Sequence, residues 1–114
     1  MTQSELLSDA IALLKDLIAT PSISREEDAA ALVLENRLKA YGLQYERKGN
    51  NIWCLSPRWE EGKPTLLLNA HIDTVKPVSS WTRNPFEPSL EEDTLYGLGS
   101  YDCGGGLVTL LQVY

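Results

Sequence analysis

The sequence lacks the features that would place it in several large classes of protein. No unbroken apolar run approaches the ~20 residues that a membrane-spanning helix needs. Basic residues are few, and the formal net charge of −6 argues against nucleic acid or an anionic membrane as the main partner. The first residues include Glu5 and Asp9 in place of a basic stretch, so we expect no secretory signal.

Cysteine is also scarce, with only Cys54 and Cys103 in the chain. Two cysteines favour free thiols in a reduced compartment, so we expect a cytoplasmic protein, and one disulfide between them stays open as an alternative. The other residues are those of an ordinary globular protein, 43% hydrophobic and 23% charged over 114 positions. A chain of this length buries roughly 65% of its unfolded surface, which is enough to fold without a disulfide or a structural metal.

Two helices are predicted in the first part of the chain. Apolar residues recur at three- and four-residue spacing over residues 3–19 and again over residues 25–41. Ser24 and Glu27 fit a capping box at the start of the second helix, and Gly42 stands where a C-terminal glycine cap belongs.

From residue 43 onward the apolar residues no longer recur every three or four positions but alternate with polar ones, which indicates strands. Residues 43–55 surround a Gly-Asn-Asn turn and predict an antiparallel hairpin, and a second short hairpin is predicted within residues 90–98. Residues 65–70 are apolar on both faces, which is typical of a strand covered on two sides. Residues 107–114 have the apolar pattern of the first turns of a buried helix. Because the sequence ends at apolar residues without a C-terminal helix cap, we expect that the chain continues. We therefore predict an α/β fold, a mixed β-sheet with flanking helices.

The first candidate for chemistry is His71-Ile72-Asp73, directly after the predicted strand at 65–70. Strand alternation places residues 71 and 73 on one side, at the end of a strand where open α/β sheets bind their ligands. A metal-binding histidine usually donates its other ring N–H to an oxygen, and a carboxylate two residues on can accept it. The alternative is a lone core histidine bonded to a nearby acid.

The second candidate is the glycine-rich segment 97–106, which holds five glycines and one acid, Asp102. Glycines permit close backbone approach, and a carboxylate among them is well placed to coordinate a metal through both oxygens. A phosphate loop is the weaker interpretation, because Gly105 stands where the Walker pattern needs lysine and Asp102 would repel phosphate. A flexible glycine turn is the plain alternative.

Cys103 could serve as a metal ligand or as a nucleophile. No Cys-x-x-Cys pair exists, His71 is the only histidine, and a cysteine hydrolase also needs a positioned base. A chemical role for Cys103 is therefore the weaker interpretation, and Cys54 is predicted to be a small core residue.

Together these segments resemble the signatures of the M20 metallopeptidases. The resemblance covers most of residues 5–114 and rests on three motifs: His71-Ile72-Asp73-Thr74-Val75 with Pro77, Trp81 with Pro85-Phe86, and Gly97-Leu98-Gly99 through Asp102 with Gly104-Gly105. Within the family the chain is most similar to the acetylornithine deacetylases. Succinyl-diaminopimelate desuccinylases, aminoacylases and carboxypeptidases are alternatives.

The resemblance implies a catalytic α/β domain with two zinc ions, for which cobalt or manganese could substitute. It implies that His71 binds one zinc and that Asp102 bridges both. Asp73 would act in catalysis without ligating, by orienting His71, and the Asp102–Cys103 peptide bond would be cis. Leu98 and Gly105 or its neighbour depart from the arginine and lysine of the family pattern, which puts the subgroup in doubt.

The function implied is a metal-dependent amide hydrolase that removes the acyl group from an N-acyl amino acid, a small-molecule substrate. Residues 1–114 would be the N-terminal, incomplete portion of its catalytic domain, without the lid and dimerisation domain that would make the full protein a homodimer. A Glu-Glu pair carrying the base, and the remaining ligands, would lie beyond Tyr114, so we expect this portion alone to be inactive and to bind zinc weakly. The alternative is a truncated non-catalytic paralogue that acts as a binding module or partner subunit.

Overall fold

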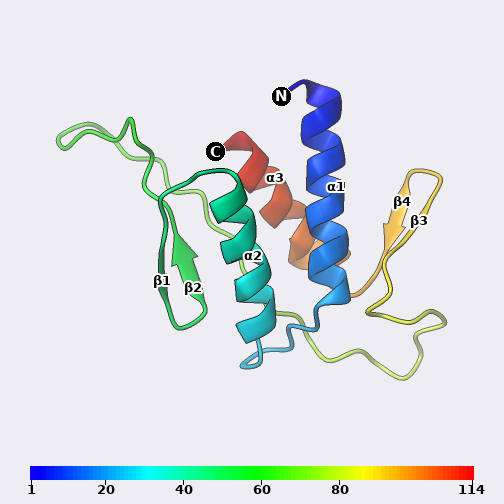
Figure 1. Cartoon of the computed structure of the whole chain (residues 1–114). Helices are drawn as coiled ribbons and strands as arrows, with labels where there is room; N and C mark the ends of the chain where they lie inside the picture. The colour runs from blue at the N-terminus through cyan, green and yellow to red at the C-terminus, as the bar shows by residue number, and fades with distance from the viewer.

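The computed structural model describes residues 1–114 and contains three α-helices and two short β-hairpins (Figure 1). None of the helices combines the length and the apolar character needed to cross a membrane. The elements are α1 (Gln3–Ala19), α2 (Asp28–Ala40), β1 (Glu46–Lys48), β2 (Asn51–Trp53), β3 (Ser89–Glu91), β4 (Thr94–Tyr96), the kinked helical turn η1 (Ser100–Gly105) and α3 (Gly106–Val113).

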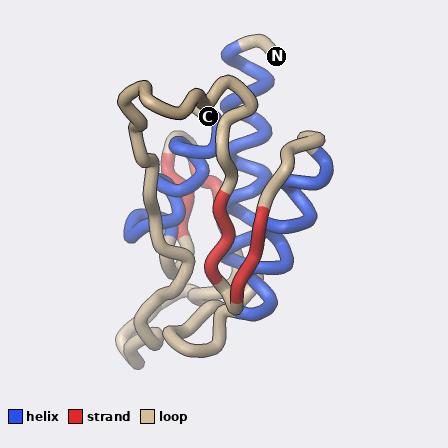
Figure 2. The backbone as a smooth tube through the Cα atoms, turned by 90° about the vertical axis from the view of Figure 1, so that its left-hand side faces the viewer, coloured by secondary structure: helices blue, strands red, loops and turns tan.

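The two hairpins lie on opposite sides of the three helices (Figures 1 and 2). In the first hairpin Arg47 faces Ile52, and in the second Leu90 faces Leu95, both in antiparallel register. Both hairpins were predicted, and they are confirmed. The mixture of helices and strands is also confirmed, but the four strands form two separate sheets and not the single mixed sheet that we expected.

Helix α1 has the limits that its sequence predicts. The Thr2 side chain accepts a hydrogen bond from the Glu5 backbone, and the Glu5 carboxylate accepts one from the Thr2 backbone, so both halves of a capping box are present. The helix ends before Pro21, where Thr20 has an extended backbone.

Helix α2 begins at Asp28, three residues later than predicted, and the capping box assigned to Ser24 is wrong. Arg25 has a positive φ of 77°, which breaks the helical path, and its N–H donates to the Glu27 carboxylate at 2.6 Å. The Ser24 hydroxyl instead donates to the Asp73 carboxylate. Gly42 has a φ of 72° after the helix, which confirms the predicted glycine cap.

The predicted strand at 65–70 is not formed, and this expectation is wrong. Leu66 and Leu67 are 83% and 80% exposed, and no residue of the segment belongs to a strand. A strand needs neighbours for its backbone N–H and C=O groups, and the only pairing near this segment is the isolated parallel bridge between Ile23 and Thr74. The apolar pattern is present, but residues 1–114 do not supply the layers that would cover it.

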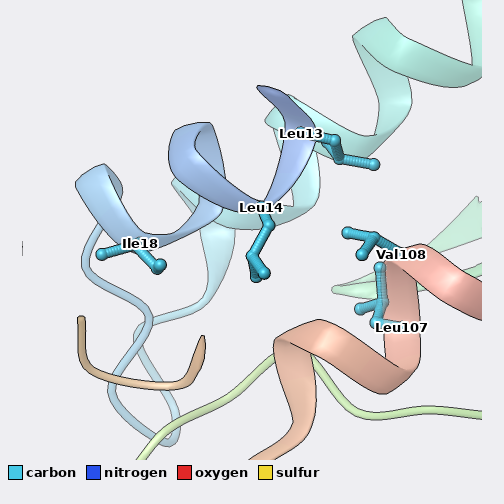
Figure 3. Close-up of a cluster of buried hydrophobic side chains, with 5 residues drawn as sticks. All are labelled: Leu13, Leu14, Ile18, Leu107 and Val108. Atoms are coloured by element: carbon cyan, nitrogen blue, oxygen red, sulfur yellow. The ribbon is translucent and has the colours of Figure 1, made fainter. Parts of the chain in front are cut away.

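The core lies where α1 meets α3. Figure 3 shows side chains of α1 pointing toward side chains at the start of α3. The cluster consists of Leu13, Leu14, Ile18, Leu107 and Val108, all at most 9% exposed. Only ten of the 114 residues are buried, so each core side chain carries a large share of the hydrophobic stabilisation.

The glycine-rich segment passes directly against this core. A Cβ on Gly104 would lie 2.6 Å from both the Gly99 carbonyl oxygen and the Leu14 side chain, so only glycine fits there without movement. The Gly104 N–H donates to that same Gly99 oxygen at 2.8 Å, which closes the η1 turn. Gly99 has a φ of 80°, and the Thr74 side chain occupies the space that a Cβ atom on Gly99 would need.

A polar cluster ties the three helices together at the Asp9 carboxylate. Arg37 of α2 donates to Asp9 at 2.7 Å, Gln112 of α3 donates at 2.8 Å, and the Tyr41 hydroxyl donates as well. The hydrogen bond from Tyr41 is the largest influence on the pKa of Asp9; it outweighs burial, and with Gln112 and Arg37 it lowers that pKa.

We predict that Gly104→Ala lowers the free energy of unfolding by about 1–3 kcal/mol, because the added methyl group must displace Leu14 or the Gly99 carbonyl. Gly106→Ala is the matched control, since no atom lies within 4 Å of its Cβ position and it begins α3. That variant should gain up to about 1 kcal/mol from alanine's helix propensity. Urea unfolding of the two variants measures the difference, and equal losses would contradict the close approach.

We also predict that Asp9 makes folding sensitive to acid. Because folding lowers its pKa below the ordinary 3.8, its contribution to stability is present at neutral pH and is lost as the pH falls through the folded-state pKa. Asp9→Asn should lower stability at pH 7 and flatten the stability profile below about pH 4. Thermal melts from pH 2.5 to 7 test this, and an unchanged acid limb in the variant would count against it.

Candidate functional site

The segment from His71 to Thr74 is held by the linker between α1 and α2. The Thr74 N–H donates to the Ser22 carbonyl at 2.8 Å, and the Ser24 N–H donates to the Thr74 carbonyl at 3.1 Å. The Ser22 hydroxyl adds a bond of 2.9 Å to the carbonyl of residue 72. These bonds fix the backbone that carries His71, although the segment lies outside any regular strand.

His71 and Asp102 meet although they are thirty-one positions apart in the chain. The Nε2 atom of His71 lies 3.0 Å from Oδ1 of Asp102. His71 comes from the anchored segment and Asp102 from the η1 turn, so the pair joins two loops. Both side chains reach solvent, at 51% and 81% exposure, so a small ligand can approach them.

Asp73 contacts the other nitrogen of the same ring. The His71 Nδ1 atom lies 3.0 Å from the Asp73 carbonyl oxygen and 3.2 Å from the Asp73 Oδ1 atom. The second oxygen of this carboxylate, Oδ2, accepts a hydrogen bond from the Ser24 hydroxyl. Ser24, Asp73 and His71 therefore form a chain of contacts that sets the direction of the imidazole.

These contacts also shift the protonation equilibria. Burial acts to lower the pKa of His71, but the Asp73 carbonyl, the Asp102 carboxylate and the nearby negative charges outweigh it and raise that pKa above 6.5. The Ser24 hydrogen bond, opposed by burial and assisted by His71, lowers the pKa of Asp73. In the absence of a metal ion, Asp73 is thus anionic at neutral pH and faces an imidazole that is more basic than usual.

The turn that carries Asp102 departs from helical geometry at two residues. Asp102 has φ and ψ of −115° and 100°, and Cys103 has −125° and 33°. The peptide bond between them is cis, as the resemblance implies. The Cys103 side chain folds back, and its thiol donates to the His71 carbonyl at 3.2 Å.

The donor set suits a divalent metal ion. An imidazole nitrogen and a carboxylate oxygen 3.0 Å apart match two neighbouring ligands of one ion, given metal–ligand distances of about 2.0–2.2 Å. The Nδ1 atom is held by an oxygen acceptor, which leaves Nε2 toward Asp102 and the ion. One ligand atom from each of His71, Asp102 and Cys103 lies within 4.8 Å of the other two.

Sequence reasoning missed two members of this neighbourhood and gave a third only a weak role. Ser24 was assigned to a helix cap, and Thr74 was not considered, although its Oγ1 atom is buried without a hydrogen-bond partner. Cys103 was given little weight. Thr74 and Cys103 line a small cavity of about 20 Å³ beside His71 and Asp73, and Ser24 does not. The serine has a helix-cap signature, so no local pattern could have assigned it to the site.

We predict that the metal-free chain titrates His71 above its ordinary pKa of 6.5. It is the only histidine, so one imidazole resonance in proton NMR follows it without ambiguity. Asp102→Asn and Asp73→Asn should each lower that pKa, because each removes a negative charge next to the ring. Asp93→Asn, an exposed acid outside the pair, is the control and should leave it unchanged.

The raised pKa of His71 also makes the stability of the metal-free fold depend on pH. Protonated His71 stabilises the metal-free fold below pH 6.5, and this contribution is lost as the pH rises through the folded-state pKa. A His71 resonance that titrates below 6.5 would contradict the geometry of both contacts.

Comparisons with known proteins match the part of the chain that carries these residues. The model of Peptidase family M20/M25/M40 matches residues 67–114, which include His71, Asp73 and Asp102. The match leaves out the two N-terminal helices and the first hairpin.

Curated relatives match almost the whole chain. It is 36% identical over 109 residues to the succinyl-diaminopimelate desuccinylase of Methylorubrum extorquens (strain PA1), which covers 89% of the chain and 28% of that relative. It is 32% identical over 111 residues to the enzyme of the same name from Xanthomonas euvesicatoria pv. vesicatoria (strain 85-10), covering 92% of the chain and 29% of that relative. The enzyme of that name from Stenotrophomonas maltophilia (strain K279a) is 33% identical over 111 residues, which cover 92% of the chain and 29% of that relative.

The chain thus spans less than a third of the length of these relatives. Motifs, site geometry and comparisons nevertheless point to one family. The segment that carries His71 and Asp102 matches peptidase family M20/M25/M40, and the chain is similar over most of its length to enzymes named succinyl-diaminopimelate desuccinylase.

Proposed function

We propose that this chain is the N-terminal portion of the catalytic domain of a metal-dependent amide hydrolase that removes the acyl group from an N-acyl amino acid. The observation that carries the proposal is the 3.0 Å approach of His71 Nε2 to Asp102 Oδ1, with Asp73 on the other ring nitrogen. Two exposed donor side chains from separate loops, with one ring already oriented, form the beginning of a metal site open to substrate.

Each residue has a distinct task in this proposal. His71 Nε2 and the Asp102 carboxylate would hold the metal, with Asp102 extending to a second ion through its other oxygen. Asp73 would hold the ring of His71 in the ligating tautomer, and Ser24 would hold Asp73. A bound pair of zinc ions, or of cobalt or manganese, supplies a water of lowered pKa and stabilises negative charge on the amide oxygen.

The base and the other ligands are proposed to lie in a further part of the protein. The matched relatives are more than three times as long as this chain, so there is room for them and for a lid and dimerisation domain. The 81% exposure of Asp102 fits a carboxylate that still has an oxygen free for ligands from another segment. Without those ligands the 114-residue chain would be inactive.

The substrate class follows from the relatives more than from the chain. All three relatives described above are named succinyl-diaminopimelate desuccinylases, so an N-succinyl amino acid is the first candidate substrate. These names give no support to the acetylornithine specificity that we expected from the sequence. Acetylated amino acids therefore become the comparison substrates.

We predict that the whole protein, loaded with zinc, releases amine from N-succinyl amino acids and loses this activity with a chelator. His71→Ala should abolish activity by removing a ligand. Asp73→Asn should lower kcat about 10–100-fold, the usual cost of losing the group that orients a metal ligand. Asp93→Asn, an exposed acid in the turn after β3, makes the same chemical change elsewhere and should leave activity unchanged. Amine release detected with a colorimetric reagent measures the unsubstituted protein and all three variants.

Two results would overturn the proposal. Hydrolysis that persists in His71→Ala would remove the metal site from the mechanism. A protein that ends at Tyr114 in its coding sequence, melts cooperatively and shows no hydrolysis would favour the non-catalytic binding module.

A further inference from the structure

We propose that Thr74 is a positioning residue for the metal site, and that its γ-methyl group sets the separation between the segment of His71 and the turn of Asp102. The inference rests on the proposed function and goes beyond it, because it gives a role to a residue that ligates no metal. Thr74 lies three residues after His71, and it packs against Gly99, which lies three residues before Asp102.

The backbone of Thr74 is held on both sides by the linker that follows α1. Its N–H donates to the Ser22 carbonyl at 2.8 Å, and its carbonyl accepts from the Ser24 N–H at 3.1 Å. The same contact forms the parallel bridge between Ile23 and Thr74. Threonine is β-branched and has restricted rotation about χ1. Its methyl group therefore starts from a fixed point and has a defined direction.

This methyl group meets the backbone of the glycine-rich turn. The Cγ2 atom of Thr74 lies 2.7 Å from the position that a Cβ atom on Gly99 would take, so it fills that space. The Gly99 carbonyl accepts the Gly104 N–H at 2.8 Å and so closes the turn that contains Asp102. A van der Waals contact at Gly99 thus links the two parts of the chain that carry the donor atoms.

The hydroxyl group of Thr74 does not take part in this link. Its Oγ1 atom is buried and has no hydrogen-bond partner. A buried polar group without a partner costs free energy, so the hydroxyl does not stabilise this arrangement. Valine has the methyl groups without the hydroxyl, and serine has the hydroxyl without the methyl group. Substitution by each of them therefore separates the shape of the side chain from its polarity.

The separation that this contact sets is critical for metal binding. The Nε2 atom of His71 and the Oδ1 atom of Asp102 lie 3.0 Å apart, and zinc requires about 2.0–2.2 Å to each of them. Loss of the methyl group leaves a space into which Gly99 can move, and the turn then carries Asp102 with it. Groups that orient metal ligands typically contribute 10–100-fold to metal affinity or activity.

The first experiment compares variants of the whole protein. Thr74→Ser should weaken zinc binding, measured by competition with a chelator, and should lower kcat about 10-fold on an N-succinyl amino acid with KM little changed. Thr74→Val, the conservative variant, should restore both zinc affinity and kcat. Leu38→Val removes one carbon from a buried side chain of α2 and is the control for lost packing, so it should change neither.

A second measurement needs neither metal nor activity. In the metal-free 114-residue chain, proton NMR should show a nuclear Overhauser effect between the Thr74 methyl group and the α-protons of Gly99. Thr74→Val should keep a methyl contact of this kind. Thr74→Ser should shift the α-protons of Gly99 and leave those of Gly42 unchanged, since no atom lies within 4 Å of the Cβ position of Gly42. Far-ultraviolet circular dichroism shows whether the helices of each variant are intact.

The outcomes separate this inference from the proposed function. If the whole protein hydrolyses its substrate with zinc and Thr74→Ser equals it in zinc affinity and kcat, the positioning role is overturned and the proposed function stands. Equal losses in Thr74→Ser and Thr74→Val would assign the effect to the hydroxyl and overturn the inference. Equal losses in Thr74→Ser and Leu38→Val, or no Overhauser effect between Thr74 and Gly99, would also overturn it. An unsubstituted protein without zinc-dependent hydrolysis would overturn the proposed function and this inference with it.

Discussion

The close approach of the glycine-rich backbone to α1 and to Thr74 is the constraint on which the rest of the site depends. Gly97 packs against Ile18, Gly99 against Thr74, and Gly104 against Leu14, in each case without room for a Cβ atom. Because Leu14 and Ile18 also belong to the main core, the burial that stabilises the fold sets the position of the turn. Asp102 then lies at His71 as a consequence of backbone contacts.

Much of the fold could be predicted because its signals are local. The apolar stripe and capping box of α1 lie within twenty residues, and both hairpins follow from turn residues and alternation. Ser24 shows the limit of such reasoning. Its pattern fits a capping box, yet its hydroxyl bonds to Asp73, 49 positions away, because Arg25 turns the chain aside. A long-range partner leaves no trace in a local pattern.

The segment at 65–70 fails for a different reason. An apolar run reports that side chains are suited to burial, but it does not provide the neighbours that bury them. Here Leu66 and Leu67 remain largely exposed and the strand does not form. The pairing of His71 with Asp102 was expected only through the resemblance to known motifs, since spacing alone left a lone core histidine equally open. The roles of the two residues as ligands stay predictions.

A site built from two loops has to obtain its rigidity from somewhere else. His71 is held by hydrogen bonds to the linker at Ser22 and Ser24, and Asp102 by the packing of the turn against α1. Both supports end on the same helix, because the linker begins where α1 stops and the turn rests on its inner face. A change in the α1 core therefore moves one side of the donor pair relative to the other. Core packing and the relative position of His71 and Asp102 are thus coupled in this chain, and substitutions at Leu14 or Ile18 would act on both.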